Sequence, residues 1–124
     1  MLRKIDNVMI GVNDLTEALN FYSDVFGLKP IWQDQNRGQA GLLFPASDSK
    51  IILYTDTEMP GRVEINYLVD DVEAAVQKYV DQGCAVLAEP FDTLVGRGAV
   101  IQDPFGVRLS IQDLSKAAVE VNPL

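Results

Sequence analysis

Residues 8–22 read VMIGVNDLTEALNFY, and residues 65–79 read INYLVDDVEAAVQKY. At an offset of 57 residues, apolar positions fall on apolar positions, Asp14 falls on Asp71, and Tyr22 falls on Tyr79. Self-similarity at a fixed spacing indicates that one supersecondary unit occurs twice. The two stretches therefore predict an internal duplication of a strand, a turn and a helix.

Each copy carries signals for the start and the end of its helix. Asp14 and Asp71 stand at N-cap positions, where a carboxylate accepts hydrogen bonds from the free N–H groups of the first turn. Gly27 and Gly83 suit the left-handed residue that follows a helix. Apolar residues between these signals repeat at helical spacing and predict one buried stripe per helix. The stripes are Leu15, Ala18, Leu19, Tyr22, Val25 and Phe26, and Val72, Ala75, Val76, Tyr79 and Val80.

Three short strand-like runs follow each helix. They cover 30–35, 39–44 and 50–55 after the first helix, and 85–90, 98–103 and 107–112 after the second. We therefore predict an α+β fold of two βαβββ modules, within a single domain over 1–124. Module one covers about 1–57, a linker 56–62, module two about 62–113, and a C-terminal tail 114–124.

Strand alternation divides the predicted sheet into two faces. Aliphatic residues on one face, such as Ile10, Leu53 and Ile111, are expected under the helices. The other face mixes aromatic, apolar and amide groups, which is typical of a ligand cleft, although a solvated outer face would also be mixed. The predicted ligand-binding residues on this face are Asn7, Met9, Trp32, Ile52, Tyr54, Glu64, Asn66, Leu68, Arg108, Ser110 and Gln112.

Composition excludes several classes of function. The chain has no histidine, which removes the commonest metal ligand and every Ser-His-Asp or Cys-His catalytic arrangement. The net charge of −8 argues against nucleic acid or an anionic membrane as partner. The sequence shows neither a membrane span nor a signal peptide, and its one cysteine, Cys84, suits a reducing compartment. We therefore expect a cytoplasmic protein whose partner is a small molecule.

The chain resembles the vicinal oxygen chelate superfamily, which includes glyoxalase I, extradiol dioxygenases and bleomycin-resistance proteins. The resemblance is carried by IDNVMIGVNDLTEALNFYSDVFGLKP, INYLVDDVEAAVQKYVDQG and DPFGVRLSIQD, and it covers nearly the whole chain. It implies that the paired βαβββ modules form an open, cleft-like β-barrel with the helices on its outer face. It also implies a homodimer.

Enzymes of this family hold a divalent metal at four cleft positions. Carried over to this chain, those positions are Asn7, Ile52, Glu64 and Ser110. A single carboxylate beside an amide, a hydroxyl and a hydrocarbon makes a poor metal site. We therefore expect no metal and no cofactor.

Three functions remain open. The first is a metal-free binding protein of the bleomycin-resistance type that sequesters an aromatic or cationic ligand, with Trp32 and Tyr54 stacking and Glu64 attracting the cation. The second is a metal-independent isomerase or lyase in which Glu64 is the general base and Arg108 holds an anionic group. The third is an interaction module whose sheet face contacts another protein. The sequence favours the first and leaves it undecided whether Asn7 contacts the ligand or only its neighbours.

Overall fold

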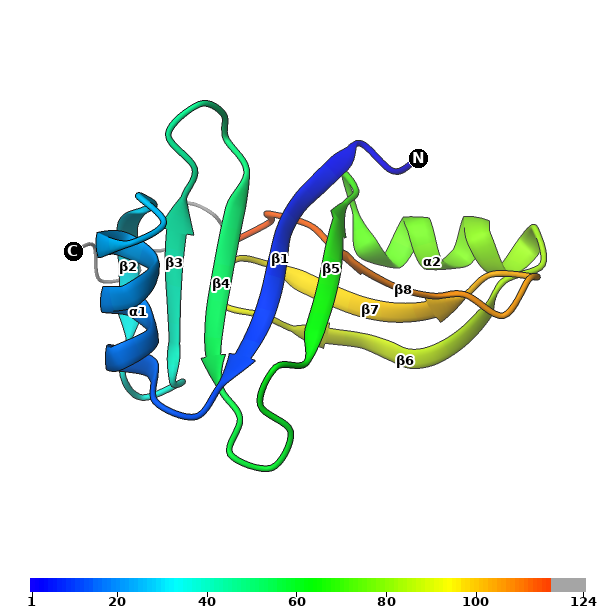
Figure 1. Cartoon of the computed structure of the whole chain (residues 1–124). Helices are drawn as coiled ribbons and strands as arrows, with labels where there is room; N and C mark the ends of the chain where they lie inside the picture. The colour runs from blue at the N-terminus through cyan, green and yellow to red at the C-terminus, as the bar shows by residue number, and fades with distance from the viewer. Residues whose placement is uncertain (117–124) are drawn as a thin grey trace. The chain divides into compact units, whose positions relative to one another are not determined.

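The computed structural model describes residues 1–116 and has the predicted α+β element order, βαβββ followed by βαβββ (Figure 1). Neither of the helices within these residues has the length and apolar run needed to cross a membrane. The predicted elements are confirmed to within about two residues. Their bounds are β1 Lys4–Val12, α1 Leu15–Asp24, β2 Lys29–Asp34, β3 Gln39–Leu43, β4 Lys50–Thr55, β5 Val63–Leu68, α2 Val72–Asp81, β6 Ala85–Asp92, β7 Arg97–Gln102 and β8 Arg108–Gln112.

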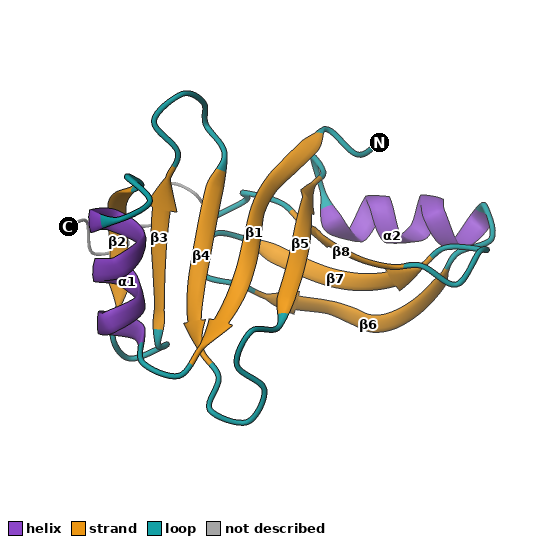
Figure 2. Ribbon diagram, in the orientation of Figure 1, coloured by secondary structure: helices purple, strands orange, loops and turns teal. Residues whose placement is uncertain are grey.

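The described chain divides into two compact units. The first unit is residues 7–64, and the second unit is residues 1–6 together with 65–116. The first carries strands in the order β2-β3-β4-β1, and the second carries them in the order β5-β8-β7-β6 (Figure 2). In the first unit β4 runs parallel to β1, and in the second unit β8 runs parallel to β5. The other neighbouring pairs within each unit are antiparallel. The boundaries predicted for the modules, and their closure into a cleft-like barrel, stay predictions.

The first unit is built around α1. Asp14 caps this helix as predicted, because its Oδ1 accepts a hydrogen bond from the Glu17 N–H at 2.9 Å. Leu15 and Leu19 pack on a buried cluster supplied by β3, β4 and the turn after the helix. The predicted helix-facing positions in β1 and β4 are confirmed by this cluster and the residues packed against it. These residues are Leu28, Ala40, Leu42 and Leu53, with Ile10, Val12, Ala18, Tyr22 and Ile51 at the edge.

The last part of the predicted α1 stripe is wrong. Val25 and Phe26 are 60% and 58% exposed. The helix ends at Asp24, and Gly27 then takes the left-handed conformation with φ 77°, so these two side chains leave the helical face. The Phe26 ring instead meets the rings of Phe21 and Tyr22 edge to face.

The second unit is built around α2 in the same way. The Asp71 carboxylate accepts from the Ala74 N–H at 2.9 Å, as predicted for an N-cap. Val72, Ala75 and Val76 are buried against β7 and β8. Two strand positions predicted to lie under this helix, Ile65 and Val107, are exposed instead, because α2 packs chiefly against β6 and β7. Val63 in β5 is exposed as well, and so is Val80, which was predicted to belong to the buried stripe of α2 itself.

A buried carboxylate links three segments of the second unit. Asp113 is 2% exposed and accepts hydrogen bonds from the backbone N–H groups of Val72, at 2.9 Å, and of Arg97, at 3.0 Å. The Ser115 hydroxyl donates to the same carboxylate at 2.7 Å. Burial alone would raise the pKa of Asp113, but these hydrogen bonds outweigh it and hold the pKa below its usual value. The start of α2, the start of β7 and the segment after β8 are thereby joined. Most of the predicted tail, residues 117–124, lies outside the described residues.

Candidate functional site

The predicted site residues are divided between the two units. Asn7, Met9, Trp32, Ile52, Tyr54 and Glu64 belong to the first unit, and Asn66, Leu68, Arg108, Ser110 and Gln112 belong to the second. The predicted convergence of all of them on one cleft stays a prediction. Each unit nevertheless has a defined arrangement on the sheet face that its helix does not cover.

In the first unit, Trp32 lies across Gly41. The two residues are opposite each other in the β2–β3 ladder, and Gly41 is in turn opposite Ile52, which is opposite Met9 in β1. A Cβ built on Gly41 would lie only 2.4 Å from Trp32 Nε1. The indole therefore occupies the space that any larger residue would need. A glycine within a strand often marks such a close approach.

A β-bulge precedes the tryptophan. The register of β2 against β3 shifts between Pro30 and Trp32. Bulges turn a side chain to a new direction and are frequent beside functional sites. Here the shift places the indole over Gly41, a contact that the sequence reading missed.

Tyr54, two residues along β4 from Ile52, makes a similar contact with a glycine. It lies opposite Gly11, and a Cβ on Gly11 would lie 3.2 Å from both Cζ and the hydroxyl of Tyr54. The pKa of Tyr54 is raised, first by burial and then by the negative charge of Asp56, while Arg62 opposes the shift and Glu64 adds to it. The phenol is therefore within electrostatic reach of two carboxylates.

Asn7 differs from these neighbours in its burial. Only 1% of its surface is exposed, whereas Met9, Trp32, Ile52, Tyr54 and Glu64 are half-buried. A buried amide is held by hydrogen bonds within the protein. This burial favours a supporting role for Asn7 over contact with a ligand.

The second unit presents a more polar and more enclosed face. Asn66 lies opposite Ser110 in the β5–β8 ladder, and both are 8% exposed. The Gln112 amide donates to the Asp6 carboxylate at 2.8 Å, and this pair is also buried. Arg108 is exposed at the start of β8. Most predicted site residues of this unit are therefore buried, and their binding role stays a prediction.

The residues at the four family metal positions do not fit a divalent metal. Ile52 supplies no donor atom, and Glu64 supplies the single carboxylate of the set. Across residues 1–116, no group of three or more His, Cys, Asp or Glu is placed to hold a metal ion.

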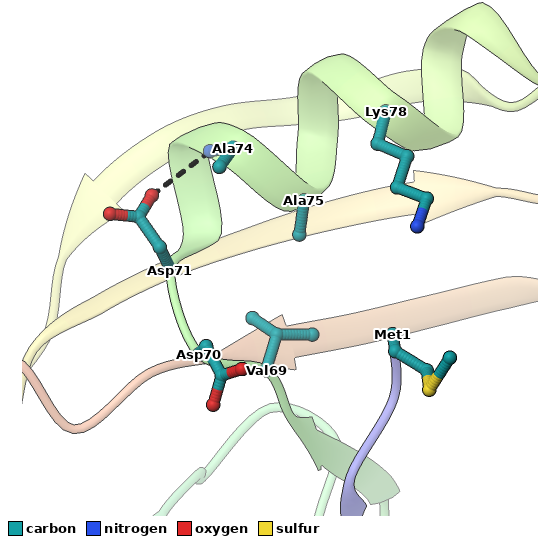
Figure 3. A pocket seen from close by; sticks show the side chains of 7 residues that line it. All are labelled: Met1, Val69, Asp70, Asp71, Ala74, Ala75 and Lys78. Atoms are coloured by element: carbon teal, nitrogen blue, oxygen red, sulfur yellow. Dashed lines mark hydrogen bonds between the residues drawn. The ribbon is translucent and has the colours of Figure 1, made fainter.

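A pocket of about 150 Å³ lies elsewhere, at the start of α2 in the second unit (Figure 3). The Lys78 ammonium and the Met1 side chain stand at one end, and Asp71 caps the helix at the other. Val69 and Ala75 form its apolar wall. No sequence motif indicates this pocket, because its lining brings Met1 together with residues about 70 positions later in the chain.

The geometry and the order of elements define a known class of protein. Residues 4–111 match the model of the Glyoxalase/Bleomycin resistance protein/Dioxygenase superfamily, and the chain belongs to this superfamily. The resemblance seen in the sequence is thereby confirmed.

Two kinds of relatives support this assignment. The chain is 35% identical over 98 residues to "Putative glyoxylase CFP32" of Mycobacterium tuberculosis, a match that covers 76% of this chain and 38% of that protein. It is 29% identical over 117 residues to "Anthracycline biosynthesis protein DauV" of a Streptomyces species, covering 89% of this chain and 41% of that protein. The chain thus spans about two fifths of the length of these curated relatives.

Solved structures show the same fold. Methylmalonyl-CoA epimerase from Mycobacterium tuberculosis matches with a TM-score of 0.77 and 23% identity, covering 96% of this chain and 93% of that chain. A Streptomyces coelicolor methylmalonyl-CoA epimerase variant in complex with 2-nitronate-propionyl-CoA matches with a TM-score of 0.73 and 22% identity, covering 93% and 99%. At these identities the likeness extends to the fold alone.

Proposed function

We propose that this chain is a metal-free small-molecule binding domain that holds a flat, cationic aromatic ligand on the uncovered sheet face of the first unit. The observation that carries the proposal is the position of Trp32 across Gly41. A half-buried indole fixed on a glycine keeps one ring face against the backbone and is preorganised for stacking. Ile52 and Met9 extend the apolar surface along the same ladder row.

The charge near Tyr54 supports a cationic ligand. Asp56 and Glu64 both raise the pKa of this phenol, which means that the local potential is negative there despite Arg62. A ligand cation near the Tyr54 ring would gain from the ring's electron-rich face and from the two carboxylates. The net charge of −8 would add to this attraction at long range.

The same geometry favours one enzymatic alternative. The Glu64 carboxylate helps to raise the pKa of the Tyr54 phenol, so a carboxylate and a hydroxyl near each other could take part in proton transfer. In that case Glu64 would be the general base of a metal-independent isomerase or lyase. Such an enzyme would convert its ligand into a product, whereas simple sequestration consumes no ligand.

The proposal is tested with proflavine, a planar tricyclic cation, as the probe. Trp32 is the sole tryptophan, so quenching of its fluorescence reports binding beside it directly. Titration calorimetry then compares the wild type with Trp32→Leu and Glu64→Gln. The matched control is Glu17→Gln, which removes one carboxylate from α1 on the covered side of the sheet.

We expect saturable quenching, and a loss of affinity in Trp32→Leu of about 2- to 12-fold, which corresponds to about 0.5–1.5 kcal/mol for one aromatic pair. Glu64→Gln should weaken binding at low salt, and Glu17→Gln should not. Equal affinities in all four proteins, or no quenching, would contradict the proposal. We further expect a homodimer without bound metal, which native mass spectrometry of the purified protein checks through its mass and metal content. The expected location is the cytoplasm, which cell fractionation checks.

A further inference from the structure

The second unit repeats the aromatic–glycine contact of the first. Gly98 stands 57 residues after Gly41, the spacing of the internal duplication. It lies opposite Phe91 in the β6–β7 ladder. A Cβ built on Gly98 would lie 2.9 Å from Phe91 Cε1 and 3.0 Å from Cζ, so the phenyl ring lies across this glycine as the indole lies across Gly41.

The local backbone is also repeated. The register of β6 against β7 shifts between Ala88 and Phe91, just as the register of β2 shifts between Pro30 and Trp32. In each unit, therefore, a bulge stands immediately before the aromatic residue. A bulge changes the direction of the side chain that follows it. The same local irregularity of the strand therefore places each ring over its glycine.

The Phe91 ring lies on the sheet face that α2 does not cover. Gly98 is opposite Gln112, whereas the next residues along, Ala99 and Ile111, pack in the core beneath α2. Side chains alternate along each strand, so Gly98, Gln112 and Phe91 share the other face. Phe91 is 44% exposed, which leaves much of the ring open to solvent although the glycine lies beneath it.

We propose that Phe91 and Gly98 form a ring-binding site of the second unit, which takes a planar, uncharged aromatic ring. The ring of the ligand would stack on the open face of Phe91, with the Thr93 methyl group beside it. The neighbouring charges are already paired with one another: Asp92 with Arg97 at 3.1 Å and with Lys116 at 2.7 Å. Because these three charged groups pair with one another, we take the ligand ring to be uncharged.

An aromatic ring over a glycine can also serve the sheet alone, since it covers backbone that the glycine leaves bare. The two roles make different demands on residue 91. Covering the backbone needs only an apolar side chain, so Phe91→Leu would preserve it. Binding a flat ring needs an aromatic face, so Phe91→Leu would lose it.

Indole is the probe, and ¹H–¹⁵N correlation spectra of the whole chain are the readout. We expect saturable shifts of the Thr93 and Gly98 amide signals in the wild type. Phe91→Leu should keep the dispersion of a folded spectrum and weaken the binding reported by these amides by about 2- to 12-fold, the loss of one ring–ring contact. The control is Phe105→Leu, a ring that is 88% exposed in the turn before β8, and it should leave the response unchanged.

Absence of saturable shifts at Thr93 and Gly98, or shifts of undiminished size in Phe91→Leu, would overturn the proposal. Phe91→Tyr is a second variant that restores the aromatic face, and a weakened response there would count equally against it. The two binding experiments distinguish this proposal from the proposed function of the first unit. Proflavine quenching of Trp32 tests the first unit, and the indole response of the Gly98 amide tests the second, so either can fail alone.

Discussion

Replacing Gly41 by alanine adds one methyl group at the point where the Trp32 indole crosses the sheet. The added Cβ would lie 2.4 Å from Nε1 and 2.5 Å from Cε2 of the indole, whereas ordinary van der Waals contact begins at 3.4 Å. The indole must therefore move by about 1 Å, an adjustment of the size that overpacking forces on a well-packed site. The backbone of Gly41 itself is not in the left-handed region, so alanine meets no strain in its own φ.

The expected cost follows from two opposed effects. Overpacking destabilises by about 1–3 kcal/mol, and replacing glycine by alanine at a permitted conformation stabilises by about 0.4–1 kcal/mol through the unfolded chain. The net loss for Gly41→Ala should be about 1–2 kcal/mol. In a Trp32→Ala background the clash is absent, and the same substitution should instead stabilise by the smaller amount.

Two measurements test this reasoning. Urea denaturation followed by circular dichroism gives the stability of the wild type, the two single variants and the double variant. Tryptophan emission of Gly41→Ala should shift to longer wavelength, because the displaced indole becomes more exposed to water. An unchanged emission maximum, or an equal stability change in both backgrounds, would show that the indole does not lie across this glycine.

The remaining predictions concern the second unit and the helix caps. Asp113→Asn should lower the free energy of unfolding by about 1.5–3 kcal/mol in urea denaturation, because hydrogen bonds from Val72 and Arg97 would lose their charged acceptor; a loss below 0.5 kcal/mol would contradict this. Since folding lowers the pKa of Asp113, its contribution is present above the unfolded value of 3.8 and is lost as pH falls through the folded pKa. Stability measured from pH 5 to pH 2 should therefore fall less steeply in Asp113→Asn than in the wild type, and parallel curves would argue against the assigned cause. Asp14→Ala and Asp71→Ala should each cost about 1 kcal/mol in the same denaturation experiment, because each carboxylate caps its helix; thermal or urea midpoints equal to the wild type would show that the caps are dispensable.

Much of the fold is encoded locally. The caps at Asp14 and Asp71 are confirmed, as are the left-handed glycines at positions 27 and 83, with φ 77° and 109°. A cap or a helix-ending glycine depends on neighbours three or four residues away, and the same is true of helical periodicity. The duplication could be read for the same reason, because repeated local signals remain visible in one dimension.

The errors occur where a helix covers less of a strand than expected. Alternation placed Ile65 and Val107 on the side of the helix, but α2 packs chiefly on β6 and β7, and both residues are exposed. Alternation along a strand tells which residues share a face. It does not tell how far a helix extends over that face, because this depends on long-range packing.

The family and the apolar, aromatic composition of the uncovered face were determined by the sequence alone. The particular surfaces were decided by tertiary structure. Nothing near Gly41 or Gly98 in sequence indicates that a ring lies across it, because the ring comes from a neighbouring strand and reaches the glycine only through a bulge in the ladder. Glycine has no side chain with which to signal a contact, so its role becomes visible only when the strands are paired in register.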